Sequence, residues 1–163
     1  MFRAEEYFRM DSVRLALNGD NINPGFLKII SKYSSTQAAN LAEFYAGTCY
    51  MKLGDFNNAI KHLKNFSGSA LQVQARTHGL LGDAYSELNN KQEAISEYKK
   101  AGTIFDKDNL LSPEYLFRAG YLSESIGKNQ EAIEMYQLIK DKYPNSQRGY
   151  DIDRYLARLG VVK

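Results

Sequence analysis

The chain has 163 residues, 44% hydrophobic and 25% charged, a composition that excludes a disordered or fibrous protein and allows a substantial core. Its 21 basic and 19 acidic residues leave a net charge of +2, so no long-range attraction draws it to nucleic acid or to an anionic membrane. No stretch approaches the roughly 20 consecutive apolar residues of a membrane span, and the single cysteine, Cys49, cannot form an internal disulfide.

The first part of the chain predicts a pair of helices. Residues 3–17 carry helical periodicity and predict one helix, which ends at Asn18-Gly19-Asp20. The next stretch, INPGFLKIISKYSS, predicts a second helix that begins at Asn23-Pro24-Gly25. Its apolar residues repeat the spacing of a later segment, with Phe26, Ile29 and Tyr33 matching Tyr136, Ile139 and Tyr143. We therefore expect residues 3–35 to form a degenerate first repeat unit.

Three later stretches share one sequence pattern. They read FNNAIKHLKNF at 56–66, KQEAISEYKKA at 91–101 and NQEAIEMYQLI at 129–139. Their central alanines, Ala59, Ala94 and Ala132, are 35 and 38 positions apart, and a glycine lies twelve positions before each. Self-similarity at this period predicts a stacked array of repeats.

Each repeat reads as two helices joined by a short break. Gly54, Asn89 and Gly127 occupy the break and suit the left-handed position that closes a helix. Asp55 and Asn129 are predicted to cap the helix that follows. The glycines at 47, 82 and 120 are expected to let the first helix approach the alanine of the second. The large residues beside that contact are Leu63, Tyr98 and Tyr136.

The end of the array has two features of its own. The connection 101–113 is longer than its counterpart after Phe66, and Ser112-Pro113 is predicted to start the next helix, with Ser112 as its N-cap. The extra length is either a spacer or the wall of a small-ligand or enzymatic cleft. Residues 146–159 predict an amphipathic helix that caps the last core layer, with Ile152, Tyr155 and Leu159 on its apolar side.

The spacing of these residues resembles the tetratricopeptide repeat. Leu81-Gly82, Tyr85, Ala94, Tyr98 and Ala101 follow the family pattern in one unit, and Gly47, Tyr50, Gly54, Phe56, Ala59 and Leu63 follow it in another. The third unit has Ser123 in place of the family's tyrosine, and the early tryptophan is replaced by Glu43, His78 and Leu116. The resemblance implies an all-α, right-handed α-solenoid of about four units, at 3–35, 36–68, 69–106 and 107–145, followed by the capping helix.

The resemblance also implies a binding face. Family members bind partners on a concave groove lined by the first helices, and this chain places there Phe44, Thr48, Met51, Gly79, Asp83, Ser86, Phe117, Tyr121 and Glu124. The Lys, Asn and Arg clamp with which some members hold a terminal carboxylate is absent from these positions. The aromatic anchors among them, with Asp83 and Glu124 nearby, imply an extended or helical peptide partner, or a protein, with apolar and basic side chains. The alternative is that they pack only between repeats.

No motif for catalysis or cofactor binding is present. His62 and His78 have no ligand neighbour at metal-site spacing, and no phosphate-binding loop or nucleophile motif occurs. Basic residues alternate with acidic ones rather than forming a stripe. We therefore expect a non-enzymatic scaffold with no metal, no cofactor and no nucleic-acid partner. Self-association through the end helices is a further possibility.

The final stretch, KDKYPNSQRGYDIDRYLARLG at 140–160, resembles the end of tetratricopeptide proteins of the bacterial envelope. It implies a role in envelope protein biogenesis on the periplasmic side of the inner membrane. Helical periodicity starts almost at Met1, which we read as the loss of a preceding membrane anchor. A cytoplasmic scaffold is the competing interpretation.

Overall fold

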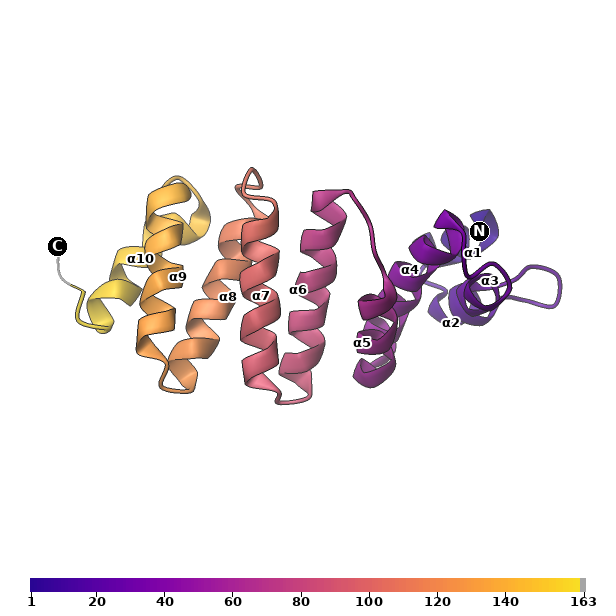
Figure 1. Cartoon of the computed structure of the whole chain (residues 1–163), viewed down its shortest axis with the longest axis horizontal. Helices are drawn as coiled ribbons and strands as arrows, with labels where there is room; N and C mark the ends of the chain where they lie inside the picture. Colours follow the sequence, from indigo (N-terminus) through magenta and orange to yellow (C-terminus); the bar gives the residue numbers. More distant parts are fainter. Residues whose placement is uncertain (162–163) are drawn as a thin grey trace. The chain divides into compact units, whose positions relative to one another are not determined.

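The computed structural model describes residues 1–161, which form ten α-helices and no β-strand (Figure 1). A single isolated bridge joins Gly19 to Pro24. The chain divides into two compact units, one spanning Met1–Ser69 and the other starting at Ala70. We refer to them as unit 1 and unit 2 and describe each by itself. The predicted all-α solenoid class is confirmed.

Unit 1 contains the degenerate first repeat and the first complete repeat. Its helices are α1 (Phe2–Arg9), α2 (Val13–Asn18), α3 (Phe26–Lys32), α4 (Gln37–Leu53) and α5 (Phe56–Asn65). Its core joins small residues of α1, α2 and α4 to the aromatic residues of α3 and α4. Phe26 is completely buried, and its ring stacks on Tyr45 with the ring centroids 5.0 Å apart.

The amino-terminal helix prediction was wrong in its extent. Residues 3–17 form two helices rather than one. Asp11, between the end of α1 and the start of α2, takes the left-handed conformation (φ 57°) and interrupts the helix. Aspartate tolerates this conformation better than most residues. The second predicted helix is also shorter, since Asp20 accepts backbone hydrogen bonds from Ile22 and Asn23 and holds residues 19–25 in a loop.

Unit 2 contains two complete repeats and the closing helix. Its helices are α6 (Leu71–Glu87), α7 (Lys91–Ile104), α8 (Leu111–Ser125), α9 (Asn129–Lys142) and α10 (Gln147–Arg158). Neighbouring helices run in opposite directions side by side (Figure 1). Helix α10 buries Ile152 and Leu156 and leaves its opposite side exposed. It has the amphipathic character predicted for a cap.

The breaks between paired helices agree with the sequence. Gly54, Asn89 and Gly127 have φ values of 75°, 59° and 77°, in the left-handed region. The Asp55 carboxylate accepts the backbone N–H of Asn58 at 3.2 Å and caps α5 as expected. Asn129 does not cap α9, because it is the first residue inside that helix.

The connection 101–113 is packed against the ends of its own helices. Ser112 is not the N-cap, since α8 begins one residue earlier and Asp108 accepts the N–H groups of Leu110 and Leu111 at 2.9 and 2.8 Å. The buried Ser112 hydroxyl instead donates to the carbonyl oxygen of Phe105 at 2.8 Å. The Tyr143 hydroxyl donates to the carbonyl oxygen of Asp106 at 3.0 Å. These bonds tie the connection to α8 and α9.

The repeat glycines lie against the large residues rather than the alanines. A Cβ atom at Gly82 would lie 2.5 Å from Cδ1 of Tyr98, and one at Gly120 would lie 2.6 Å from Cε1 of Tyr136. Gly47 is equally close to Leu63, with 2.6 Å to its Cγ. Each first helix therefore uses glycine to accept a large side chain of its partner helix. Real Cβ contacts at such distances would force the ring or the helix to move.

Ser123 provides a test of the core of unit 2. Its side chain is completely buried, and its hydroxyl has no hydrogen-bond partner within residues 1–161. Removing an unsatisfied hydroxyl removes a desolvation penalty, so Ser123→Ala is expected to raise the free energy of unfolding by about 1 kcal/mol. Chemical denaturation measures the change.

Ser112 supplies the matched control, because it is equally buried and its hydroxyl is hydrogen-bonded. Ser112→Ala is expected to lower the free energy of unfolding by about 1 kcal/mol. A loss of stability in both variants would show that the Ser123 hydroxyl also has a partner.

Candidate functional site

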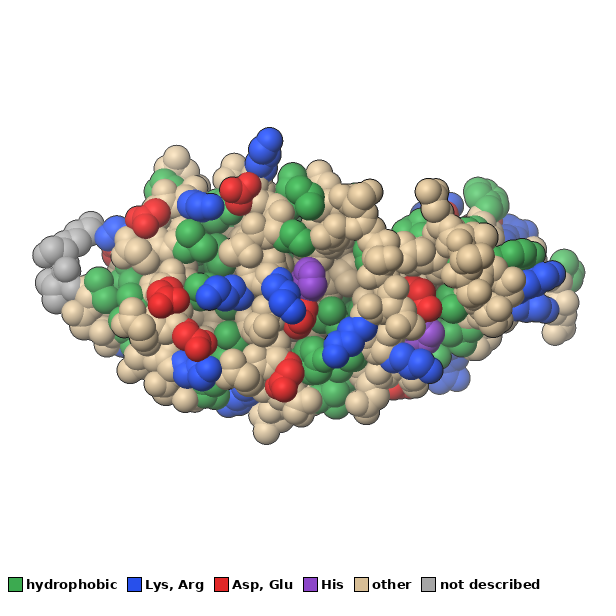
Figure 2. Space-filling model, in the orientation of Figure 1, with side chains coloured by type: hydrophobic (Ala, Val, Ile, Leu, Met, Phe, Trp, Pro, Cys, Tyr) green, Lys and Arg blue, Asp and Glu red, His purple; other side chains and the backbone are tan. Residues whose placement is uncertain are grey.

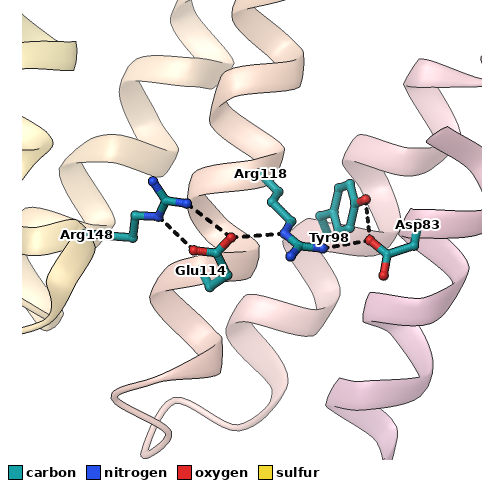
Figure 3. A network of polar contacts seen from close by, with 5 residues as sticks. All are labelled: Asp83, Tyr98, Glu114, Arg118 and Arg148. Carbon is teal, nitrogen blue, oxygen red and sulfur yellow. Dashed lines mark hydrogen bonds and ion pairs between the residues drawn. The ribbon is translucent and has the colours of Figure 1, made fainter. Parts of the chain in front are cut away.

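In unit 2, charged side chains of the first helices form a continuous network on α6, α8 and α10 (Figure 3). We call this surface the first-helix face. It comprises the four charged residues of this network, Asp83, Glu114, Arg118 and Arg148, together with Ser86 and Tyr121 on the same helices and a separate ion pair, Glu124 with Arg158. Helical spacing accounts for it, since Glu114, Arg118 and Tyr121 succeed one another at intervals of four and three residues on one side of α8.

Asp83 stands at one end of this network. One of its oxygens, Oδ1, accepts hydrogen bonds from the Tyr98 hydroxyl at 2.7 Å and from Nη1 of Arg118 at 2.8 Å. Tyr98 belongs to α7 and Arg118 to α8, so the carboxylate connects three successive helices. Burial raises the pKa of the Tyr98 hydroxyl, and the bond to Asp83 raises it further.

Glu114 is the centre of the network. Its Oε2 accepts from Nε of Arg148 at 2.7 Å, and its Oε1 accepts from Nη2 of Arg148 at 3.2 Å and from Nε of Arg118 at 3.1 Å. The paired bonds from Arg148 are of the strong, bidentate kind. Hydrogen bonds from Arg148, opposed by burial and assisted by Arg118, lower the pKa of Glu114.

The last repeat contains a second version of the Asp83 arrangement. Oε2 of Glu124 accepts from the Tyr136 hydroxyl at 3.1 Å and from Nη2 of Arg158 at 2.8 Å. In both places a first-helix carboxylate receives a tyrosine from the second helix and an arginine from the next first helix. Burial and the Glu124 carboxylate raise the pKa of Tyr136. The two predicted acidic positions, Asp83 and Glu124, are therefore both neutralised within the chain.

The predicted aromatic residues of unit 2 differ in accessibility. Phe117 is only 8% exposed, since the Arg148 guanidinium lies 3.8 Å from its ring centroid and Tyr155 packs edge-on at 4.8 Å. Packing between repeats, the alternative interpretation, describes Phe117. Tyr121 is 56% exposed and stacks on Phe117 with a centroid distance of 6.1 Å. Ser86 is exposed, and Gly79 lies beneath the ring of Tyr115.

The three predicted residues of unit 1 lie on α4 and are described separately. Phe44, Thr48 and Met51 are half-buried. The Phe44 ring packs against Phe66 with a centroid distance of 5.6 Å, and the Thr48 hydroxyl donates to the carbonyl oxygen of Phe44 at 2.9 Å. Phe44 therefore contributes to local packing in unit 1.

Sequence reasoning missed a pair of partly buried histidine–carboxylate contacts. Nδ1 of His62 lies 2.6 Å from Oε2 of Glu43, and Nδ1 of His78 lies 2.6 Å from Oε2 of Glu97. Both pairs join a first helix to its second helix across 19 positions, but the acid and the histidine exchange places. The sequence did indicate a polar contact here, since Glu43 and His78 both stand where the family has a tryptophan.

The second of these contacts perturbs its carboxylate. Burial by itself would raise the pKa of Glu97, but hydrogen bonds from His78 and Lys100 outweigh it and lower the pKa. The third repeat carries two apolar residues at the equivalent positions, Leu116 and Met135, which are both buried. The histidines thus serve packing between paired helices.

Few features of the described residues suggest metal binding, a reactive thiol or a ligand pocket. Within residues 1–161, no group of His, Cys, Asp and Glu side chains could hold a metal ion, and no helix is long and apolar enough to cross a membrane. Burial raises the pKa of the Cys49 thiol to about 12, which leaves it unreactive. Two polar surface hollows of about 360 and 450 Å³ lie in unit 1, around residues 18–33 and 30–67. The face seen in Figure 2 shows basic and acidic side chains interspersed.

Comparisons with known proteins agree with this architecture. Two tetratricopeptide repeat models match the chain, one at residues 41–67 and 114–146 and the other at 75–104. Two crystal structures of MamA are similar in fold at 21% sequence identity and a TM-score of 0.71, covering 97% of this chain and 85% and 79% of theirs. A search of curated proteins finds no match. The repeat matches together span more than half of the chain, which therefore belongs to the tetratricopeptide repeat family, whose helix pairs form protein-interaction scaffolds.

Proposed function

We propose that the protein is a non-enzymatic scaffold that binds a peptide or protein partner on the first-helix face of unit 2. The observation that carries this proposal is Tyr121, an aromatic side chain that is 56% exposed in the middle of that face. Aromatic residues held in place in a surrounding ring of polar contacts often dominate the energy of an interface. Phe117 supports the Tyr121 ring from below, so little conformational entropy remains to be lost on binding.

The polar network gives this face a fixed shape. Asp83, Glu114 and Glu124 each hold an arginine of the same or the next first helix, and Tyr98 and Tyr136 fix two of the carboxylates from below. A face built on helices with paired side chains is preorganised for binding rather than adaptable. Such a surface suits a scaffold that holds one partner in a defined register.

Affinity capture from the cells that produce the protein tests the proposal. The wild-type chain is compared with Tyr121→Ala and with Tyr150→Ala, a control in which a 75% exposed tyrosine of α10 is removed outside the face. We expect Tyr121→Ala to weaken a partner, once purified, by about tenfold or more, and Tyr150→Ala to leave the affinity unchanged. A partner that binds all three proteins equally would place the interface elsewhere.

We further propose that the scaffold works in protein biogenesis at the bacterial envelope, on the periplasmic side of the inner membrane. The support is the resemblance of residues 140–160 to the ends of envelope tetratricopeptide proteins. Protease treatment of intact spheroplasts tests the compartment. Digestion of the natural protein without lysis would support it, whereas protection until lysis would assign the scaffold to the cytoplasm.

A further inference from the structure

On the first-helix face of unit 2, the hydrogen-bond donors of the arginines that remain unused outnumber the unused acceptors of the carboxylates. This observation concerns the chemistry of the partner and therefore rests on the proposed function. Asp83, Glu114 and Glu124 already accept seven hydrogen bonds from tyrosines and arginines. Guanidinium groups carry several N–H donors each and no acceptor. Within residues 1–161, Arg118 uses Nε and Nη1 and Arg158 uses Nη2 in these bonds, which leaves their other nitrogens to contact a ligand.

The arginines also lie nearer to solvent than the carboxylates they hold. The Arg118 side chain is 43% exposed, against 34% for Asp83 and 29% for Glu114. The difference is larger in the second arrangement, where Arg158 is 51% exposed and Glu124 only 21%. An approaching partner therefore meets guanidinium groups first, although the charges in the network balance.

Tyr121 lies on α8 between these two arginines in sequence, one turn after Arg118 and one turn before Glu124, which binds Arg158. Its exposed ring provides an apolar contact between two cationic positions. The complement of this pattern is an aromatic or aliphatic side chain flanked by acceptors. Carboxylates are the strongest acceptors for guanidinium groups.

We propose that the first-helix face binds a peptide segment in which acidic side chains flank an aromatic or aliphatic residue. The acidic side chains pair with Arg118 and Arg158, and the apolar side chain covers Tyr121. A lysine-rich segment is disfavoured, because its ammonium groups meet the more exposed guanidinium groups first, while Asp83, Glu114 and Glu124 are each already paired with an arginine. Specificity thus comes from repulsion of basic segments as well as attraction of acidic ones.

Three synthetic peptides of equal length test the inference. The first alternates glutamate with leucine around a central phenylalanine, and the other two replace every glutamate by glutamine or by lysine. Fluorescence anisotropy measures their affinity for the full chain at low and high salt. We expect the glutamate peptide to bind most tightly, with an affinity that falls as salt is raised, and the lysine peptide not to bind.

Substitutions locate the site. Arg118→Gln and Arg158→Gln are each expected to weaken the glutamate peptide by about tenfold, since a charge-assisted hydrogen bond is lost. Arg14→Gln, which removes an exposed arginine of unit 1, is the matched control and is expected to leave the affinity unchanged. Circular dichroism and thermal unfolding of each variant separate loss of binding from loss of structure.

The possible outcomes distinguish this inference from the proposal on which it rests. Tighter binding of the lysine peptide, abolished by Tyr121→Ala, would overturn the acidic specificity and keep the interface. Binding of the glutamate peptide that neither arginine substitution affects would overturn the assigned site. Absence of binding by the glutamate peptide would overturn the inference, while the fate of captured partners in the Tyr121→Ala variant decides the proposed function separately.

Discussion

Replacing Ala94 with leucine is expected to lower the free energy of unfolding of unit 2 by about 1–3 kcal/mol or more. Ala94 is completely buried on α7, the helix that packs against α6. Space beside it is already taken by the Tyr98 ring, which lies against Gly82 and whose hydroxyl is bonded to Asp83. A leucine at this position cannot be accommodated by a rotation of that ring without breaking the bond. Thermal and chemical unfolding measure the loss.

Ala157→Leu is the control for this substitution. Ala157 lies in the last turns of α10 and is exposed, so the same increase in side-chain volume meets solvent. We expect its effect to stay within about 0.5 kcal/mol. If the two variants were equally stable, Ala94 would not be at a close helix contact, and the register of the repeats would have to be reassigned.

The repeat units of unit 2 could be predicted from the sequence because each depends on residues close together in the chain. Gly82, Ala94 and Tyr98 serve a single helix pair, and their spacing reflects the period of an α-helix. The left-handed residues Asn89 and Gly127 are likewise local signals, since few residue types tolerate that conformation.

Predictions failed where local signals competed. Residues 3–17 retain helical periodicity across the break at Asp11, so periodicity alone could not locate it. At the start of α8, both Asp108 and Ser112 are suitable capping residues, and a serine directly before proline is the more familiar signal. The buried contact of Ser112 with Phe105 decides the competition, and it depends on how the connection folds.

The candidate site could be predicted only in part. Family positions identified Asp83, Tyr121 and Glu124. The arginines that neutralise the two carboxylates, however, come from the next repeat or from the closing helix. Arg118 contacts Asp83 across 35 positions and Arg158 contacts Glu124 across 34. No local pattern links residues so far apart. The burial of Phe117 beneath Arg148 and Tyr155 also requires the closing helix to be in place.

The contact between His78 and Glu97 is expected to be replaceable as a pair but not one residue at a time. Its two side chains are 27% and 12% exposed, so each group has lost part of its hydration. His78→Leu alone leaves the Glu97 carboxylate with only Lys100 and is expected to cost about 1–3 kcal/mol. The double variant His78→Leu/Glu97→Met copies Leu116 and Met135 of the next repeat. Because a partly buried polar pair often gains little over apolar packing, we expect it to match or exceed wild-type stability.

The pH dependence of unfolding provides a second measurement. The pKa of Glu97 is lowered in the folded protein from its ordinary value of 4.5. Its contribution to stability is therefore present above pH 4.5 and is lost as the pH falls through the lowered value. The double variant lacks this carboxylate, so its stability should fall less than that of the wild type on acidification. Glu114, whose pKa is also lowered, remains in both proteins and contributes equally.

The exchange variant His78→Glu/Glu97→His separates charge pairing from position. It reproduces the order found in unit 1, where the acid Glu43 lies on the first helix and His62 on the second. Two repeats of one chain use opposite orders at the same spacing, which indicates that the helix contact accepts either. We expect the exchange to restore at least half of the stability lost in His78→Leu, as a double-mutant cycle with both single substitutions would report. If the exchange were as damaging as the single change, the surroundings of each side chain, including Lys100, would determine the order, and the pairs would not be interchangeable.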